Sequence, residues 1–367
     1  MDLFPCSPEE LAAQLAAVAA KKQSITLRGN GTKDAMGGPI QPSDAILSTS
    51  QMKRVLQYEP RDLTISVEAG ITWNEFNNLL SEHGQMVPLD PPFADETTIG
   101  GVIAANVCGP RRRLYGSARD MVIGMTFATL EGKLIRTGGM VVKNVAGLDM
   151  AKLMIGSFGT LAAIAVVNFK LYPQPAGTRT FVQEFVRAAE TVAARDRVLR
   201  SVLQPVAIDI VKSQQGYDLV VQAGGSPAVL DRYERELTGF RALDEEREDI
   251  MWWNIREFTS DFVRDHPDGA VVRVSCALAE VAQVLEALPI PAIARAGSGV
   301  CYGYYSNARD LRLPPLGKSV VEFAPQKYRE TTELWPAPGA DFGMMKKVKE
   351  MFDPNGLLNR RRLYGRI

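Results

Sequence analysis

The spacing of apolar residues predicts a helix near the start of the chain. Leu11–Ala20 carries apolar side chains at helical spacing. Ser7, Pro8 and Glu10 stand where an N-cap, a first-turn proline and the partner of a capping box belong. We therefore expect an amphipathic first helix here and not a signal peptide. No stretch reaches about 20 uninterrupted apolar residues, so we expect no segment that spans a bilayer.

Short strands and helices follow. Residues 24–28, 64–68 and 161–171 have the pattern of strands, and residues 121–136 that of a hairpin turning at Glu131-Gly132. Thr72 and Glu75 form a capping box that begins a helix ending at Gly84. Because these elements do not alternate as a βαβ repeat, the pattern predicts an α+β domain with many short strands.

The segment 173–177, rich in proline and glycine, predicts a domain boundary. Beyond it, strands and helices alternate as two β-α-β-β-like units, which indicates a ferredoxin-like cap domain. We expect helices over residues 188–203, 227–237 and 278–288 and strands over 181–186, 206–211, 219–222, 270–275, 292–296 and 300–305. The expected domains are residues 1–175, 176–330 and 331–367, the last a C-terminal segment.

Composition excludes some classes of function. Lys+Arg and Asp+Glu both number 42, so no net field attracts nucleic acid. The four cysteines, Cys6, Cys108, Cys276 and Cys301, contain no C-x-x-C spacing. With only two histidines, a metal site built by this chain is not expected. Scattered single thiols are typical of a reducing compartment, which favours the cytoplasm.

Three glycine loops carry the candidate chemistry: residues 28–33, 97–109 and 156–161. Glycine lets the backbone approach a ligand closely and presents free N–H donors, so the loops suit a phosphate-bearing cofactor. Each loop alone also fits a structural reading: a turn after a strand, a tight entry to a helix, and a turn into a buried strand. The first is not a Walker A loop, because it lacks that spacing.

In order and content, these three loops resemble the FAD-binding domain of the vanillyl-alcohol oxidase/p-cresol methylhydroxylase superfamily. The resemblance covers residues 20–175 and implies a two-lobed FAD-binding domain beside the cap. It also implies that the C-terminal segment, residues 331–367, returns to the FAD-binding domain. Matched to the family's motifs, the expected FAD-binding residues are Gly29, Asn30, Gly31, Thr32, Lys33, Pro91, Thr97, Thr98, Gly100, Gly101, Ala105, Asn106, Gly159, Thr160 and Ile164. The stretch 143–149 resembles a further family motif, with Leu148 in place of the usual Tyr.

The resemblance also implies how the cofactor is held. Many relatives carry a flavin-linking His in the first loop, and this chain has neither His nor Cys there. We therefore expect non-covalent FAD. Cys108 is read as a small apolar residue and not as an attachment site.

The sequence departs from the family at residues 295–302. Relatives that oxidise D-2-hydroxy acids carry histidines and an acidic residue there, whereas this chain has Ser298 in place of the acid and Tyr302 where a His would stand. The base that hydroxy-acid oxidation needs is therefore missing from that strand, and the catalytic residues stay unknown. His83 is expected at the end of a helix and His266 in a surface loop.

Four charged stretches leave alternatives open. Arg256 lies in a W-x-x-R stretch whose Arg approaches the substrate side of the flavin in relatives, and a core helix with a salt-bridged Arg is the other reading. Residues 244–249 read as a solvated helix face. Residues 111–113 fit a phosphate-facing or partner-facing loop. Residues 360–362 follow Asn359 where relatives have a Pro-containing motif.

Over nearly its whole length, the chain resembles the smaller flavin subunits of bacterial glycolate oxidases. This implies an FAD-linked oxidoreductase subunit, inactive alone, in a complex that oxidises glycolate and D-lactate. Its partners would be a larger paralogous flavin subunit and an iron–sulfur subunit, with peripheral association at the inner face of the cytoplasmic membrane through them. The alternatives are a stand-alone FAD-dependent 2-hydroxy-acid dehydrogenase using Tyr302, Arg256 or Lys143, and a structural subunit without turnover.

Overall fold

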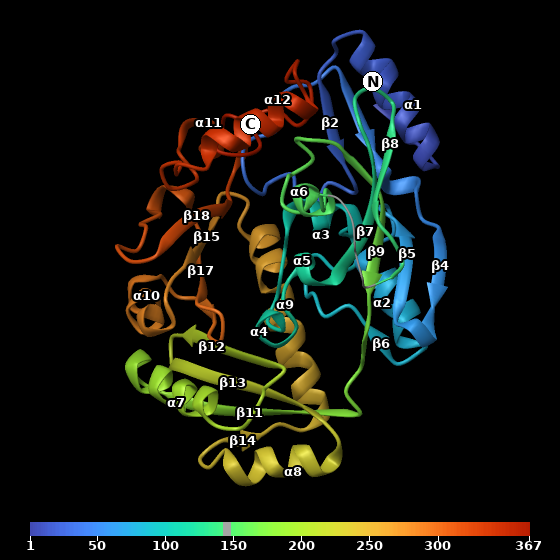
Figure 1. The fold of residues 1–367 in the computed structure, drawn as a ribbon. Coiled ribbons are helices and arrows are strands. Elements are labelled where there is room, and N and C mark those ends of the chain that lie inside the picture. Colours follow the sequence, from blue (N-terminus) through green and yellow to red (C-terminus); the bar gives the residue numbers. More distant parts are fainter. Residues whose placement is uncertain (142–147) are drawn as a thin grey trace.

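The computed structural model describes residues 1–141 and 148–367 (Figure 1). Its N-terminal part contains a parallel three-stranded sheet in the order β1–β3–β2, formed by Asp2–Leu3, Ala45–Ser48 and Ile25–Arg28. A five-stranded antiparallel sheet has the order β4–β5–β9–β7–β8. Its strands are Val55–Glu59, Thr64–Glu68, Ala163–Lys170, Val122–Ala128 and Leu134–Gly138. A two-stranded ribbon joins β6 (Gln85–Met86) to β10 (Tyr172–Pro173).

Apolar side chains on both faces of the five-stranded sheet bury it between two helical layers. Helix α1 (Pro8–Ala20) and the small parallel sheet pack on one face. Helices α2 (Trp73–Ser81) and α3 (Ile99–Ala105) cover the other. The short helices are α4 (Arg112–Tyr115), α5 (Ala118–Met121) and α6 (Ala151–Met154).

Two expected helix caps form, one of them differently from the expectation. The Thr72 side chain accepts from the N–H of Glu75, whose carboxylate accepts from the N–H of Thr72, so this capping box is confirmed. The Ser7 hydroxyl accepts from the N–H of Glu10, but the Glu10 carboxylate accepts from the N–H of Cys6 instead of Ser7.

The second half of the chain forms one eight-stranded antiparallel sheet, called the large sheet below. Its order is β14–β11–β13–β12–β16–β17–β15–β18. In that order its strands are Arg241–Ala242, Gly177–Phe185, Gly216–Gly225, Ala207–Ser213, Ala292–Arg295, Val300–Tyr305, Ala270–Ser275 and Lys318–Phe323. The two expected β-α-β-β units, β11-α7-β12-β13 and β15-α10-β16-β17, are present. They meet through β12 and β16, so the sheet is wider than one ferredoxin-like unit.

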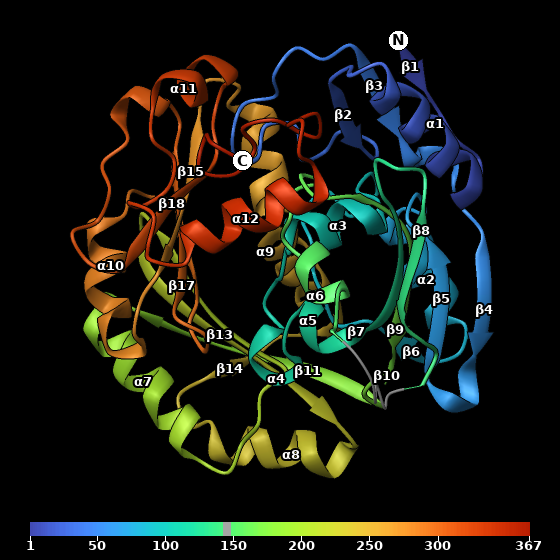
Figure 2. The same ribbon diagram turned by 45° about the horizontal axis from the view of Figure 1, so that its top comes forward.

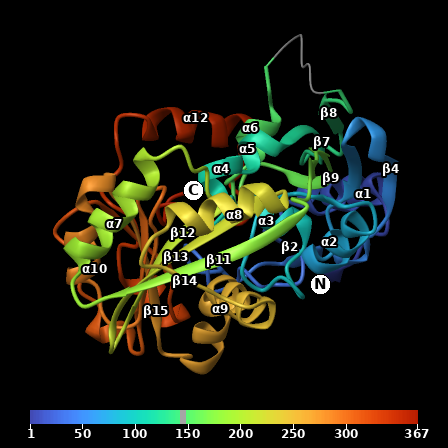
Figure 3. The same cartoon turned by 90° about the horizontal axis from the view of Figure 1, so that it is seen from below.

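Helices cover both faces of the large sheet. Helices α7 (Ala188–Arg200), α8 (Pro227–Glu236) and α10 (Val281–Ala287) pack on one face around a large apolar core. Helix α9 (Glu245–Asp265) packs on the opposite face through Trp252 and Ile255 (Figure 3). The sequence pattern predicts parts of α9 but not its 21-residue length. The α+β class is confirmed.

The C-terminal segment returns to the N-terminal part of the molecule. After α11 (Gln326–Thr331), helix α12 (Phe342–Phe352) packs through Val348 and Phe352 on the core beneath α3 (Figure 2). The chain then pairs with β2, where the N–H of Ile25 donates to the carbonyl of Leu357 at 2.8 Å. The start and the end of the chain therefore build the same region of the molecule.

Candidate functional site

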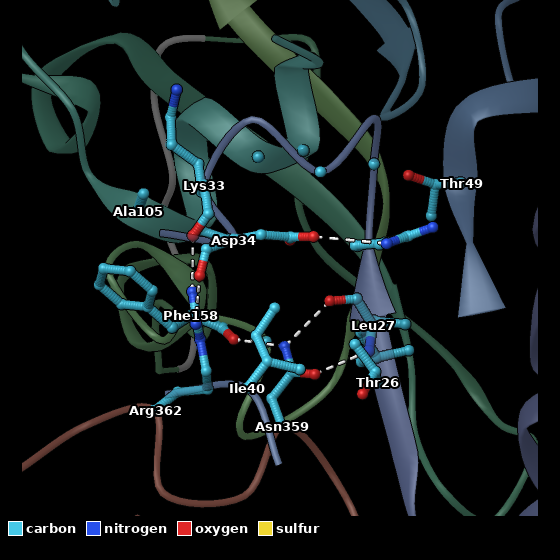
Figure 4. A pocket seen from close by; sticks show the side chains of 18 of the residues that line it. Thr26, Leu27, Lys33, Asp34, Ile40, Thr49, Ala105, Phe158, Asn359 and Arg362 are labelled. Atoms are coloured by element: carbon cyan, nitrogen blue, oxygen red, sulfur yellow. Dashed lines mark hydrogen bonds and ion pairs between the residues drawn. The ribbon is translucent and has the colours of Figure 1, made fainter. Parts of the chain in front are cut away.

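A cavity opens where β2, α3 and the C-terminal segment meet (Figure 4). Its walls come from the loop after β2, the first turns of α3, residues 158–164 and the stretch after Leu358. Eleven of the fifteen expected site residues line it: Gly29, Asn30, Gly31, Thr32, Lys33, Thr98, Gly100, Gly101, Ala105, Gly159 and Ile164. The three glycine loops, far apart in the sequence, thus share one cavity.

Four expected residues lie outside the lining: Pro91, Thr97, Asn106 and Thr160. Thr97 is fully buried, and its hydroxyl bonds that of Thr32 at 3.2 Å. The Thr160 hydroxyl donates to the carbonyl of Ser157 at 2.7 Å. Asn106 ends α3 in the left-handed conformation, with φ of 51°. These residues support the loops that form the walls, and their contact with a ligand stays a prediction.

The first loop holds its backbone in place with side chains. The Ser48 hydroxyl donates to the carbonyl of Gly29, and the Asn30 amide donates to the carbonyl of Glu96 at 2.8 Å. A Cβ at Gly29 would lie 2.1 Å from the Thr98 hydroxyl, so close packing requires glycine there. Within the described ranges, the N–H groups of residues 30–32 have no acceptor, which leaves them free for an anion.

The second loop is both a helix entry and a cavity wall. The Thr98 hydroxyl accepts from the N–H of Gly101 at 3.2 Å and caps α3. Val102 and Ile103 point into the core, whereas Gly100 and Gly101 line the cavity. The structural and functional readings of this glycine pair are therefore compatible.

The C-terminal stretch contributes lining residues that the sequence analysis left out of the site. Asn359 accepts from the N–H of Leu27 at 2.7 Å and donates to the carbonyls of Leu27 and Phe158. A Cβ at Gly159 would lie 2.7 Å from the Asn359 amide nitrogen. Arg360 and Arg362 also line the cavity. These residues were not predicted as site residues because they lie far from the three loops along the chain, although their chemistry suits the site.

Arg362 fixes the turn that follows the first loop. Its guanidinium donates to the carbonyls of Lys33 at 2.8 Å and Gly38 at 2.7 Å, and it lies 5.6 Å from the Phe158 ring centre. Burial lowers the pKa of Arg362 to about 10. The guanidinium stays charged at neutral pH and adds positive charge near the cavity.

Lys33 is unusual among the charged residues of this site because its ammonium is buried. The residue is only 9% exposed, and its ammonium lies 3.3 Å from the carbonyl of Pro92 and 3.5 Å from the Thr32 hydroxyl. Across residues 1–141 and 148–367 it forms no ion pair. Burial lowers the pKa of Lys33 to about 7, against the opposing effect of Glu257, Glu322 and Glu96.

A buried ion pair lies at residues 295–302, the segment in which the sequence departs from the family. Arg295 and Asp209 bond at 2.5 Å, and the Arg295 guanidinium lies 5.7 Å from the Tyr302 ring centre. Burial raises the pKa of Tyr302 above its usual range and that of Tyr304 to about 12. Neither phenol is ionised near neutral pH, so neither offers a ready base.

Several charged residues take roles other than those expected. Arg111 pairs with Asp90 at 2.6 Å inside the chain, which corrects its reading as a phosphate or partner contact. Glu248 is 6% exposed and accepts from Gln222, so residues 244–249 are not a fully solvated face. Arg256 lines a separate pocket of about 700 Å³ with Asp90 and Arg111, and none of its walls belongs to the main cavity.

The histidines and Cys108 lie outside the main cavity. His83 follows α2 and packs edge-on against Tyr58. His266 is the C-cap of α9 and stacks on Phe262, so it is half-buried instead of a simple surface residue. Burial raises the pKa of the Cys108 thiol, which fits its apolar reading. Residues 143–147 of the fourth motif lie outside the described residues, and Leu148 is 85% exposed.

The comparisons with known proteins agree with this geometry. Residues 2–138 match the family model described as "FAD binding domain", and this span contains two of the three loops. The N-terminal part of this chain is an FAD-binding domain. FAD is therefore its cofactor, and the chemistry of the glycine loops with the charges of Lys33 and Arg362 fits a diphosphate-bearing molecule.

Curated relatives match over different shares of the chain. Glycolate oxidase subunit GlcE of Escherichia coli (strain K12) is 28% identical and covers 94% of each chain. Glycolate oxidase subunit GlcD of Bacillus subtilis (strain 168) is 32% identical over 52% of this chain. D-lactate dehydrogenase of Archaeoglobus fulgidus is 28% identical over 57% of it. The chain spans 41% and 47% of the last two proteins.

A solved structure shares the fold across nearly the entire chain. An alkyldihydroxyacetonephosphate synthase superposes with a TM-score of 0.70 and 18% identity, covering 98% of this chain and 75% of its own. At this identity the likeness concerns the fold alone. Among the described residues, no helix is long and apolar enough to cross a membrane, and no group of His, Cys, Asp and Glu is arranged to hold a metal ion.

Proposed function

We propose that this chain is the FAD-binding subunit of a glycolate oxidase-type complex that oxidises glycolate and D-lactate to their 2-oxo acids. The match to a GlcE subunit over 94% of both chains carries the proposal, because it includes the large sheet and the C-terminal segment as well as the FAD-binding domain. Bound FAD supplies a two-electron acceptor, which makes the chain an FAD-linked oxidoreductase of hydroxy acids.

The chain's own residues have defined parts in this proposal. The fifteen residues matched to the family's motifs, with Asn359 and Arg362, bind and orient FAD at the cavity. The domain boundaries lie after residues 175 and 330, and the large sheet belongs to the cap over the flavin ring. Electrons come from a larger paralogous flavin subunit and leave through an iron–sulfur subunit, at the inner face of the cytoplasmic membrane.

An exposed apolar feature supports a partner subunit. Met344 and Met351 lie on α12 at 62% and 80% exposure, seven positions apart and therefore on one helix face. Methionine is enriched in protein interfaces and adapts its shape to a partner. We assign this face of α12 to the contact with a partner of the complex.

Isolation from native cells tests the complex. A tagged form of the chain should copurify with a second flavoprotein and an iron–sulfur protein, and the mixture should reduce an artificial electron acceptor when glycolate is added. Recovery of the tagged chain alone, from cells that retain glycolate oxidation, would contradict the proposal. Replacing Met351 with Asp should weaken the copurification without loss of bound FAD.

We also predict that FAD is held without a covalent bond. The first loop contains no His or Cys, and the thiol of Cys108 does not line the main cavity. Acid precipitation of the purified chain should leave a yellow supernatant and a colourless pellet. Flavin absorbance that remains with the denatured pellet would show a covalent link.

A stand-alone 2-hydroxy-acid dehydrogenase is the second candidate function. Arg256 in its separate pocket favours it, because its guanidinium forms no ion pair within residues 1–141 and 148–367 and a guanidinium recognises a carboxylate through paired hydrogen bonds. Turnover of a hydroxy acid by the purified chain, lost in Arg256→Leu, would select this candidate over the complex subunit.

A further inference from the structure

We propose that Lys33 is the counter-charge of the FAD diphosphate and that it takes up a proton when the cofactor binds. This inference rests on the proposed FAD site. The starting observation is geometric: a lysine on the first glycine loop lines the cavity, is 9% exposed and has no ion-pair partner among residues 1–141 and 148–367. Buried charges in proteins are normally paired, so this ammonium lacks an anion.

The nearby carboxylates are already engaged. Glu257 of α9 accepts from the N–H groups of Phe93 and Ala94 and from the Ser260 hydroxyl. Glu322 of β18 lies 3.4 Å from Arg273, and Glu96 bonds Arg264 at 2.6 Å. They raise the pKa of Lys33 only in part against its burial.

The positive groups around Lys33 do not compete for the same anion. Arg264 lies over the ring of Phe93 at 5.4 Å, as the Lys33 ammonium does at 5.0 Å, and Arg264 is already paired with Glu96. Arg362 donates to the Lys33 carbonyl. Asp34, the next residue, pairs with Arg28 at 3.3 Å. Arg264, Arg362 and Arg28 are therefore engaged by groups of the chain itself.

The position of the ammonium favours the diphosphate over the flavin ring. The ammonium lies 3.5 Å from the hydroxyl of Thr32, whose neighbours on the loop have N–H groups without acceptors. An anion held by these N–H groups lies beside Lys33. The adjacent negative charge stabilises the ammonium and raises the pKa of Lys33 from about 7.

The difference between the pKa of Lys33 in the free chain and in the FAD complex determines whether FAD binding weakens or strengthens as the pH rises. The free chain has Lys33 largely protonated at pH 6 and largely neutral at pH 8, whereas the complex keeps it protonated at both. Binding takes up a proton above pH 7 and weakens as the pH rises. Above pH 7, the Kd for FAD increases about tenfold for each pH unit, and below pH 7 it changes little. The Kd should therefore rise about tenfold from pH 6 to pH 8.

The test measures the Kd of FAD for the cofactor-stripped chain at pH 6, 7 and 8 by flavin fluorescence. Wild type should show the tenfold rise. Lys33→Met should bind about tenfold more weakly than wild type at pH 6, with no rise toward pH 8. Lys33→Arg keeps its charge throughout and should bind with a flat pH dependence. Circular dichroism spectra confirm that each variant is folded.

Two probes locate the anion. ADP-ribose contains the diphosphate without the flavin ring, and riboflavin contains the ring without phosphate. The pH dependence should appear with ADP-ribose and vanish with riboflavin. The matched control is Lys212→Met, which removes a lysine of the large sheet whose pKa burial also lowers but which lies outside the cavity. This variant should keep the wild-type slope.

The possible outcomes distinguish failure of the proposed role of Lys33 from failure of the proposed FAD site. A flat wild-type profile, a slope retained in Lys33→Met, or a slope seen with riboflavin alone overturns the role of Lys33 and leaves the FAD site intact. Failure of wild type to bind FAD at every pH overturns the proposed cofactor site and this inference with it.

Discussion

We expect the Gly101→Val variant to fold and to lose FAD. Gly101 lies in the first turn of α3 and lines the cavity, and its φ is not in the left-handed region. A Cβ there would lie 3.3 Å from the Thr98 hydroxyl, its nearest neighbour, so the folded chain accepts a side chain once that hydroxyl moves by a few tenths of an ångström. The branched valine then occupies cofactor space. Flavin absorbance of the purified variant should fall to background.

Two comparisons make this result specific. Gly343 lies in α12 outside the cavity, with nothing within 4 Å of its added Cβ, so Gly343→Val should keep its flavin. Gly29→Ala is a poor test, since its Cβ would meet the Thr98 side chain at 2.1 Å and disturb the fold itself. Full flavin occupancy in folded Gly101→Val would mean that the second loop does not face the cofactor.

The purified chain alone should not oxidise glycolate or D-lactate at a useful rate. Hydroxy-acid oxidation must remove the hydroxyl proton as a hydride leaves, and a positioned base contributes about 10²–10⁴-fold to the rate. Residues 297–302 offer no His or carboxylate. Burial raises the pKa of Tyr302 further above neutrality, and the nearby Arg295 is already paired with Asp209.

Steady-state assays with an artificial electron acceptor check this prediction. Activity should appear only when the larger flavin subunit and the iron–sulfur subunit are added. Robust turnover by the lone chain would contradict it, and Tyr302→Phe would then show whether that phenol takes part. The same assay on the complex with the Gly101→Val variant tells whether this chain's flavin is needed for electron flow.

Local patterns were sufficient for most elements of the fold. The Ser7 and Thr72 caps mark the starts of α1 and α2 because a side-chain oxygen satisfies a free N–H of the first turn. The hairpin of β7 and β8 follows from alternation around a Glu-Gly turn. Only parts of the long helix α9 were predicted. Its tryptophans and its acidic residues each occur on both the buried and the exposed side of the helix, so residue type does not mark a single buried face.

The candidate site was predictable where its chemistry is local. Glycines at 29, 31, 100 and 159 stand out in the sequence because backbone approach and positive φ leave few other residues possible. Eleven expected residues line one cavity. Asn359 and Arg362 have no such local signal, since the carbonyls of Leu27, Phe158 and Lys33 that they bind lie between 201 and 332 positions away.

The sequence by itself determined the α+β class, the three glycine loops and the missing histidines of the large sheet, because each depends on residue type and short spacing. Tertiary structure alone decided that Asn359 and Arg362 of the C-terminal segment line the cavity, that Arg111 pairs with Asp90, and that Lys33 is buried with no carboxylate at ion-pair distance among the described residues. Pairing and burial depend on which distant segments pack together. No local pattern encodes that choice.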